Sequence, residues 1–294
     1  MVKISIIIRT LNESRYLDLL LSSIRDQKIN DLGCEIIIVD SGSTDKTLEI
    51  AQNHRCKIVH ISKKEFSYGR SLNLGCEAAN GEFLVIISGH CVPENSDWLL
   101  NLIKPLINDQ AQYSYGRQLG DDQSQFSEKR IFEKYFPDSI IDNQKEYFCN
   151  NANSAISYKL WSEYRFDEDL TGLEDIDLAK RVIENNKKVS YVPKAAVYHY
   201  HNENWQQIQL RFEREALALQ KIMPNISINF FDVMRYFIIS VLKDCSSALY
   251  KGVLLNEFLN IVFYRWHQYK GVFKGSNNHR ILSDLEKEKY FYPD

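Results

Sequence analysis

The first part of the chain alternates short apolar runs with amphipathic segments. Residues 83–87 form an uninterrupted apolar run that ends at Ser88-Gly89-His90 and Pro93, which is typical of a buried strand in a parallel sheet. Comparable β-branched runs lie at residues 4–8, 34–39 and 57–61. The segments between these runs predict helices over residues 17–24, 48–51 and 71–79. This alternation indicates a mostly parallel α/β sheet flanked by helices, in which ligands bind at the carboxyl ends of the strands.

Polar residues at the strand ends and helix starts carry the first candidate chemistry. Asn12 or Ser14 is predicted to cap the helix that begins near residue 17. Asp40 ends the second strand, and its carboxylate suits either a ribose or base edge or the start of the next helix, where we expect Asp45 to be a cap. Arg70 begins a helix, and helical N–H groups together with a guanidinium suit a diphosphate.

The second half of the chain follows a less regular pattern. Short strands are expected at residues 113–118, 189–192 and 196–198, with a polar and irregular segment over residues 119–143. Residues 149–156 have the small side chains of a strand that passes close to a ligand. A helix is expected to begin in the last part of the acidic segment 166–177 and to run to residue 185. Further helices are expected over residues 205–221 and in the aromatic segment 229–294. We therefore divide the chain into an α/β domain over residues 1–220 and a helical C-terminal subdomain over residues 221–294.

The composition narrows the class of protein. The chain has 294 residues, of which 44% are hydrophobic and 26% charged, and its net charge of -3 offers no basic face for nucleic acid. Its six cysteines include no C-x-x-C pair, which favours reduced thiols over disulfides or a zinc site. The first residues run directly into a strand and no apolar run of about 18 residues occurs, so neither a signal peptide nor a spanning helix is predicted. These features indicate a cytoplasmic protein.

Two clusters of titratable residues have both a structural and a catalytic interpretation. Glu174, Asp175 and Asp177 crowd one turn, where they either complement a helix dipole or supply a general base near an acceptor hydroxyl. His199 and His201 are two residues apart on a strand and therefore share a face. Together with His90 they suit a metal ion if the fold brings the three side chains close.

Taken in order, five blocks of the sequence resemble the family 2 glycosyltransferases of GT-A fold. These blocks are residues 5–13, 37–45, 69–75, 83–98 and 166–178. The resemblance covers roughly residues 3–215. It implies a GT-A domain that transfers a sugar, with inversion, from a nucleoside-diphosphate sugar to a saccharide or lipid-linked acceptor in bacterial surface polysaccharide biosynthesis.

The resemblance also assigns roles to individual residues. It implies that Asp175 is the base that deprotonates the acceptor hydroxyl for in-line attack at the anomeric carbon. The residues implied to bind the nucleotide sugar are Thr10, Asn12, Glu13, Asp40, Arg70, Asn73, Ser88 and Gly89. The acceptor side is expected to include Asn153, Trp161 and Glu174.

The chain departs from the family pattern at the end of the strand over residues 83–88. The family usually carries an Asp-x-Asp motif there, whereas this chain has Ser88-Gly89-His90. We expect a divalent metal ion, Mn²⁺ or Mg²⁺, held by His90, His199 and His201, and imidazole favours manganese because magnesium prefers oxygen ligands. The alternatives are metal-independent transfer, with Arg70 and other cations balancing the diphosphate charge, and a catalytically inactive nucleotide-sugar-binding protein.

The last part of the chain leaves three questions open. Residues 199–215 look like the rhamnosyltransferase-type branch of the family, which implies a deoxythymidine-diphosphate rhamnose donor. The apolar stretch over residues 230–242 favours the core of a helical subdomain, with peripheral contact with the inner face of the membrane or a homo-oligomer contact as alternatives. A nucleotidyltransferase on a related sheet fits Asp40 less well and leaves Asp175 unexplained.

Overall fold

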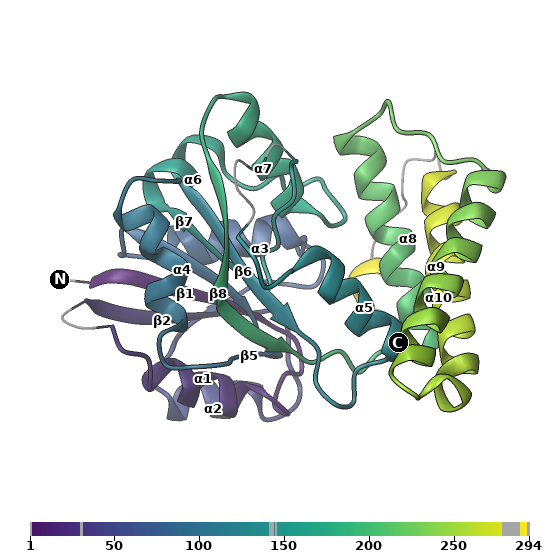
Figure 1. The fold of residues 1–294 in the computed structure, drawn as a ribbon. Helices are drawn as coiled ribbons and strands as arrows, with labels where there is room; N and C mark the ends of the chain where they lie inside the picture. Colours follow the sequence, from purple (N-terminus) through teal and green to yellow (C-terminus); the bar gives the residue numbers. More distant parts are fainter. Residues whose placement is uncertain (1, 30–31, 141–143, 145, 278–288, 293–294) are drawn as a thin grey trace. The chain divides into compact units, whose positions relative to one another are not determined.

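The computed structural model describes residues 2–29, 32–140, 144, 146–277 and 289–292 and divides into two compact units (Figure 1). The sheet unit comprises Met1–Asp121, Phe136–Asp169 and Glu174–Tyr200. The helical unit comprises Asp122–Tyr135, Leu170–Leu173 and His201–Asp294. The division expected at residue 220 falls inside helix α8 (Trp205–Ile222), which belongs to the helical unit.

The sheet unit is built on an eight-stranded sheet with the order β3-β2-β1-β4-β7-β6-β8-β5. Its strands are β1 (Val2–Thr10), β2 (Gly33–Asp40), β3 (Lys57–His60), β4 (Phe83–Ser88), β5 (Cys91–Pro93), β6 (Tyr113–Leu119), β7 (Asn153–Ser157) and β8 (Val189–His199). Only β7 and β5 run antiparallel to their neighbours among these strands. The mostly parallel α/β sheet predicted from the sequence is therefore confirmed.

Helices pack on both faces of this sheet (Figure 1). They are α1 (Leu17–Arg25), α2 (Thr47–Asn53), α3 (Tyr68–Glu77), α4 (Trp98–Ile107), α6 (Tyr158–Tyr164) and α7 (Glu174–Glu184). Ile6 and Ile8 of β1 lie in one buried cluster with residues of α1 and α4. Ile7 points to the other face, where Gly75 of α3 comes so close that an added Cβ would lie 2.5 Å from Ile7 Cγ2. Because both faces are covered, the β1 run is apolar at consecutive positions.

Two strands that contain proline differ from the sequence prediction: β5 is an additional strand after β4, and β8 is longer than expected. Pro93, expected to end a strand, lies within β5, which is tolerated because β5 is the edge strand of the sheet. The two short strands expected between residues 189 and 198 form one strand, β8, that continues through Pro193. The register with β6 shifts between Gly116 and Gln118, next to this proline, so the irregularity absorbs the missing N–H donor.

The segment 119–143, expected to be irregular, contains helix α5 (Phe126–Tyr135) of the helical unit. Its apolar pattern is weak because polar residues are buried on it. Ser127 and Glu128 are 1% and 4% exposed. Ser127 donates a hydrogen bond to Asp244 Oδ2 at 2.7 Å, and Arg265 Nε donates to the same oxygen at 2.8 Å. A sequence pattern based on apolar spacing does not detect a helix that is held by such contacts.

The rest of the helical unit consists of long helices. After α8 come α9 (Phe230–Tyr250) and α10 (Leu254–Ser276), as the helix-rich character of this segment predicts; residues 278–288 and 293–294 lie outside the described residues. Asn204 and Asn229 start α8 and α9 with capping boxes. Gly271 and Gly275 of α10 face the α8 backbone, where a Cβ at either position would collide with a carbonyl oxygen. The pair α8–α10 is therefore closely packed.

The stretch 230–242, which we expected to form a core, is largely exposed instead. Val233 is 6% exposed, but Phe231, Ile238 and Leu242 are 81%, 50% and 64% exposed. The described part of the chain contains no helix with both the length and the apolar character needed to cross a membrane.

Candidate active site

The carboxyl ends of several strands converge at one edge of the sheet. In the register of the sheet, Thr10 lies opposite Asp40 and Arg9 lies opposite Ser88. On the other side of β4, the Ser88 N–H donates to the carbonyl oxygen of Ala152 at 3.2 Å, directly before β7. The Tyr200 N–H donates to the carbonyl oxygen of His90 at 3.0 Å, directly after β8. The fold thus collects the predicted residues of four distant segments along one edge.

Asp40 holds the turn that follows β2. Its Oδ2 accepts hydrogen bonds from the N–H groups of Gly42 and Ser43 at 2.9 and 3.0 Å. Its Oδ1 accepts from the hydroxyl groups of Thr10 and Ser43. The carboxylate is 1% exposed and bonded on both oxygens, so it stabilises the loop between β2 and α2. The expected role of Asp40 as a cap of the following helix is wrong, because Lys46 is at the N-cap of α2 and the carboxylate holds the turn before that helix instead. Its contact with a ribose or base edge stays a prediction.

The loop after β1 is joined to the loop after β2. Asn12, with a positive φ of 57°, accepts a hydrogen bond from Thr44 N–H at 2.8 Å, and its own N–H donates to Ser43 Oγ at 2.9 Å. Ser14 N–H donates to Asp45 Oδ2 at 3.1 Å. The expected capping roles of Asn12 and Ser14 are therefore wrong, because their polar groups bind the neighbouring loop and α1 begins after Tyr16 without a side-chain cap. These contacts make one rigid rim from two loops.

Asp45 itself lies near, but not at, the start of α2. Its Oδ1 accepts from Thr47 N–H at 2.9 Å, whereas the residue at the N-cap is Lys46. The carboxylate therefore bonds the first helical residue and the β1 loop at the same time.

Asp175 is anchored next to the carboxyl end of β4. Its Oδ2 accepts a hydrogen bond from Asn151 N–H at 2.9 Å, and Oδ1 accepts from Ile176 N–H at 2.8 Å. Burial, reinforced by the neighbouring Glu174 carboxylate, raises the pKa of Asp175 to about 7, although the two N–H groups and Arg9 act in the opposite direction. A carboxyl group with such a pKa is suited to accept a proton near neutral pH.

Arg9 is a site residue that the sequence analysis missed. Its guanidinium lies 3.4 Å from Glu174 Oε1 and stacks over the Tyr68 ring at 4.7 Å from the centroid. Arg9 therefore connects the end of β1 with the residue adjacent to Asp175 and with the start of α3. The only signal in the sequence was its place at the end of the first apolar run.

Arg70 lies on the first turn of α3, as the sequence predicts, and its side chain is 43% exposed. Ser67 caps the helix by accepting from Arg70 N–H at 3.1 Å. The guanidinium lies 3.7 Å from Glu65 and 3.9 Å from Glu168, distances typical of weak surface ion pairs. The Arg70 side chain is therefore accessible to an anion that approaches α3.

Three other predicted binding residues have structural roles in this geometry. Asn73 uses its whole side chain within the unit, since it donates to Phe166 O and Glu168 and accepts from Phe166 N–H and Trp161 Nε1. Trp161 is 2% exposed and has its indole N–H in that bond. Asn153 is fully buried and bonds Trp98 Nε1 and two backbone carbonyl oxygens. We do not assign Asn73, Trp161 or Asn153 to the candidate site, because hydrogen bonds within the sheet unit engage the polar groups of all three side chains.

His90 and His199 come together at the edge of the sheet, at the ends of β4 and β8. Their rings stack with centroids 5.0 Å apart, and each has a ring nitrogen within 4.8 Å of one on the other. His90 Nδ1 lies 2.8 Å from Glu13 Oε1, and His199 Nδ1 lies 2.6 Å from Gln118 Oε1. An oxygen acceptor at Nδ1 favours the tautomer in which Nε2 carries the lone pair, which is the usual arrangement of a metal-binding histidine.

His201, the third expected metal ligand, is assigned to the helical unit. Its Nδ1 lies 2.6 Å from Glu128 Oε1, so it has the same kind of oxygen partner as His90 and His199. Glu203 and Glu128 both contact Arg211, at 2.7 and 3.2 Å. Because Arg211 already supplies positive charge to both carboxylates, this cluster is better suited to hold the helical unit together than to bind a cation by itself.

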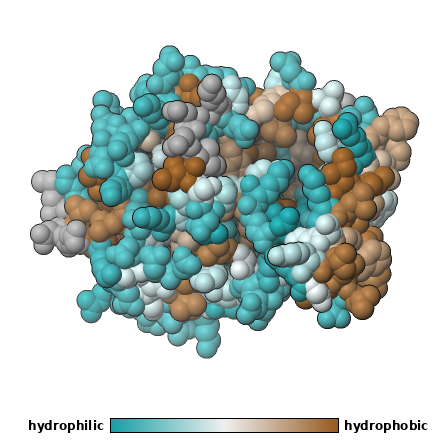
Figure 2. All heavy atoms as spheres, viewed as in Figure 1, coloured by the Kyte–Doolittle hydropathy of each residue, from teal (hydrophilic) through white to brown (hydrophobic). Residues whose placement is uncertain are grey.

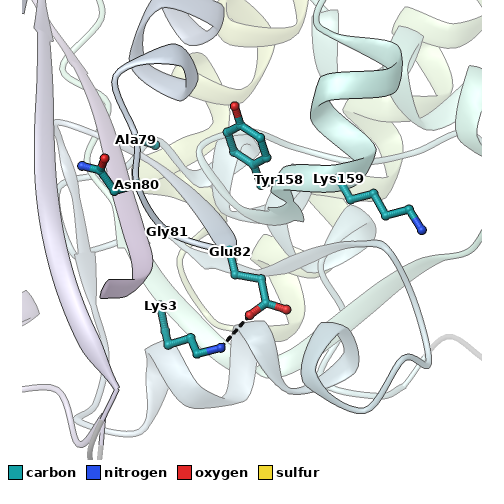
Figure 3. Close-up of a pocket in the computed structure, with 7 residues that line it drawn as sticks. All are labelled: Lys3, Ala79, Asn80, Gly81, Glu82, Tyr158 and Lys159. Carbon is teal, nitrogen blue, oxygen red and sulfur yellow. Dashed lines mark hydrogen bonds and ion pairs between the residues drawn. The ribbon is translucent and has the colours of Figure 1, made fainter. Parts of the chain in front are cut away.

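A pocket of about 430 Å³ lies at the opposite edge of the sheet (Figure 3). Lys3 at the start of β1 forms an ion pair of 2.9 Å with Glu82, which precedes β4, and Tyr158 and Lys159 complete one side. These residues lie at the amino ends of the parallel strands, where α/β folds do not place their ligands. The pocket is therefore a less suitable ligand site than the carboxyl ends of the strands, where Asp175 lies.

Comparisons with known proteins agree with this geometry. Residues 5–164 match the family model described as glycosyl transferase family 2. The poly(ribitol-phosphate) beta-N-acetylglucosaminyltransferase TarS of Staphylococcus aureus is 23% identical over 273 residues, which cover 88% of this chain and 44% of TarS. The O-antigen chain rhamnosyltransferase RfbN of Salmonella typhimurium is 27% identical over 213 residues, which cover 68% of this chain and 67% of RfbN.

A solved structure extends the likeness to the fold. The mannosyltransferase PcManGT of Pyrobaculum calidifontis, in complex with GDP-Man and Mn²⁺, superposes with a TM-score of 0.65 at 14% identity, covering 95% of this chain and 88% of that one. At this identity the likeness concerns the fold alone. The chain spans less than half the length of TarS.

Proposed function

The chain belongs to glycosyl transferase family 2, and from this premise we propose that it transfers a sugar, with inversion, from a nucleoside-diphosphate sugar to an acceptor hydroxyl. We propose a saccharide or lipid-linked acceptor and a role in bacterial surface polysaccharide biosynthesis. The observation that carries the proposal is the position of Asp175. It is hydrogen-bonded next to the end of β4 and has its pKa raised to about 7, on the same edge as Arg9 and Ser88.

In the proposed reaction, Asp175 removes the proton from the acceptor hydroxyl. The acceptor oxygen then forms a bond to the anomeric carbon as the bond from that carbon to the diphosphate oxygen breaks. The proton stays on Asp175 and the nucleoside diphosphate leaves with the bonding electrons. One protein carboxylate is sufficient because the diphosphate is already a good leaving group, whereas a glycosidase needs a paired acid and base.

The joined loops after β1 and β2 are proposed to hold the nucleotide. Asn12 lies on this rim and Asp40 fixes its shape. The remaining donor-binding residues of the proposal are Thr10, Glu13, Arg70, Ser88 and Gly89. Arg70 presents a half-exposed guanidinium at the N-terminal turn of α3, where an arginine and helical N–H groups together favour a diphosphate. Glu174, on the acceptor side, keeps Arg9 next to the base.

The three proposed metal ligands, His90, His199 and His201, are all imidazoles and suit a divalent metal ion such as Mn²⁺. His90 and His199 each have Nδ1 paired with an oxygen acceptor, so both can offer Nε2, and His201, two residues after His199, is the proposed third ligand. Nitrogen ligands favour Mn²⁺ over Mg²⁺. A bound metal ion would neutralise negative charge on the diphosphate.

The donor is tested with the full chain, Mn²⁺ and a panel of sugar nucleotides: deoxythymidine-diphosphate rhamnose, UDP-GlcNAc and GDP-Man. The panel follows the rhamnosyltransferase-like segment over residues 199–215 and the activities or ligands named for the three similar proteins. We expect one donor to release nucleoside diphosphate in proportion to added acceptor, and the product to have the opposite anomeric configuration to the donor. Donor binding without release under any condition would favour the inactive binding protein, and a retained configuration would contradict the single-base mechanism.

A further inference from the structure

Helices α9 and α10 present a large apolar surface to solvent. Figure 2 shows hydrophobic side chains gathered on the side of the molecule where Figure 1 draws these two helices. The most exposed apolar side chains on α9 are Phe231 (81%), Leu242 (64%), Leu249 (67%) and Tyr250 (93%), and Leu255 (97%) follows at the start of α10. On α10 they continue with Phe258, Leu259, Phe263 and Trp266, which are 47–64% exposed. Exposed apolar residues gathered in this way mark an interaction surface.

The spacing of these residues places them in stripes along the helices. Phe231, Ile238, Leu242 and Leu249 of α9 follow intervals of seven, four and seven residues, which lie on one helical face. Leu255, Leu259 and Trp266 of α10 follow intervals of four and seven. Both helices are amphipathic rather than apolar all round, in agreement with the finding that no described helix has the combined length and apolar character of a membrane span.

The charge of this segment differs in sign from that of the rest of the chain. Residues 230–276 contain six basic residues, Arg235, Lys243, Lys251, Arg265, Lys270 and Lys274, against three acids, Asp232, Asp244 and Glu257, a net charge of +3. The whole chain carries -3, so the remainder carries -6. Arg265 and Asp244 neutralise one another in a buried pair, and Lys251 and Lys274 form ion pairs with Glu133 and Glu213 of the same unit at 3.3 and 3.8 Å. Arg235, Lys243 and Lys270, which are exposed, supply further positive charge around the apolar stripes.

We propose that the α9–α10 surface binds an anionic lipid bilayer, with both helices lying in the plane of the membrane interface. Exposed Phe, Tyr and Trp side chains suit the headgroup region, and lysine side chains extend toward lipid phosphates while their alkyl stems stay in apolar surroundings. A second copy of the chain fits less well, because a symmetric contact would bring two segments of charge +3 together.

A small cavity between the helices supports the same occupant. It measures about 100 Å³ and is lined mainly by aromatic and aliphatic side chains, among them Phe237 and Trp266, together with Lys270. An apolar slot next to a lysine suits a short stretch of acyl chain that lies close to an anionic headgroup.

The test uses the full chain and sedimentation with lipid vesicles. We expect the protein to sediment with vesicles of phosphatidylglycerol and phosphatidylcholine, to bind much less to vesicles of phosphatidylcholine alone, and to be released by high salt. The triple variant L242S/L249S/L255S should lose most of this binding, at least about tenfold, since each residue contributes exposed apolar area. The matched control is Leu19→Ser, which changes an apolar residue of the sheet unit that is 51% exposed.

Circular dichroism establishes that the triple variant is folded, and the variant K243E/K270E provides an independent test of the charge. Failure of the wild-type chain to bind anionic vesicles would overturn the proposal. Equal binding of the triple variant would also overturn it. Sedimentation equilibrium would assign the surface to a second copy instead if the wild-type chain were a dimer, the triple variant were a monomer and the wild type did not bind vesicles. None of these outcomes depends on sugar transfer.

Discussion

Asp175 shows how burial and hydrogen bonding compete at one residue. Two backbone N–H groups favour its charged form, yet burial and the Glu174 carboxylate outweigh them and the pKa is raised to about 7. The folded protein therefore holds this proton more tightly than the unfolded chain, in which the pKa is near 3.8.

A pH dependence follows from this difference. Since transfer needs deprotonated Asp175, kcat/KM should rise with pH and level off above about 7. The contribution of Asp175 to the free energy of unfolding should fall as the pH rises from about 3.8 to about 7, because the folded state binds the extra proton in that range. Thermal unfolding of the wild type and of Asp175→Asn across this range measures the effect. Parallel Tm profiles for the two proteins would contradict the raised pKa.

A substitution of Glu13 tests whether the orientation of the His90 imidazole supports metal binding. Glu13→Gln keeps an oxygen acceptor but removes the charge that orients the imidazole at 2.8 Å, so Mn²⁺ affinity should fall about 10–100-fold by calorimetry. The matched control is Asp18→Asn, which alters a carboxylate paired at 2.8 Å with another histidine, His54, in the same unit. Unchanged Mn²⁺ affinity in Glu13→Gln would rule out a metal-orienting role for Glu13.

Single residues at strand ends were predictable, whereas buried polar pairs were not. The positions of Asp40 and Arg70 follow from where an apolar run stops or a helix begins. The contacts of Asn73 join it to Phe166 and Trp161, about 90 positions away, and no local pattern predicts such a bond. An asparagine in a motif therefore suggested a ligand contact, whereas the hydrogen bonds of its side chain all lie within the sheet unit.

At the scale of elements, apolar periodicity predicted the strands of the parallel half of the sheet. It did not predict α5, whose buried Ser127 and Glu128 hide the apolar spacing, or the passage of β8 through Pro193. Both cases depend on tertiary partners: Asp244 for the helix and the irregular β6 register for the strand.

The close packing of α3 on the sheet gives a prediction at this scale. In Gly75→Ala the added Cβ would lie 2.5 Å from Ile7 Cγ2 and 3.0 Å from Val39 Cγ2, on strands whose other face is also buried. Neither strand can retreat, so the substitution should lower the free energy of unfolding by about 1–3 kcal/mol in urea titrations. A stability equal to that of the wild type would show that α3 is free to shift.

At the scale of the whole molecule, the fold and family were predictable because five sequence blocks occur in the order and spacing typical of the family. The assignment of His201, Leu170–Leu173 and α5 to the helical unit was not, since the segments of that unit are separated by two stretches of the sheet unit, Phe136–Asp169 and Glu174–Tyr200. The opposite charges of residues 230–276 and of the rest of the chain are visible in the sequence, but their meaning depends on which side chains are exposed.

The central claim, that Asp175 is the base of a glycosyltransferase, is tested most directly by comparing Asp175→Asn with Asp177→Asn in full-length protein. Asp177 lies on the same helical turn but forms an ion pair of 2.7 Å with Arg181, so its loss should cost little activity. For Asp175→Asn we expect kcat to fall about 10²–10⁴-fold while the dissociation constant of the donor stays nearly unchanged. A near-normal kcat in Asp175→Asn, with the donor still bound, would contradict the account.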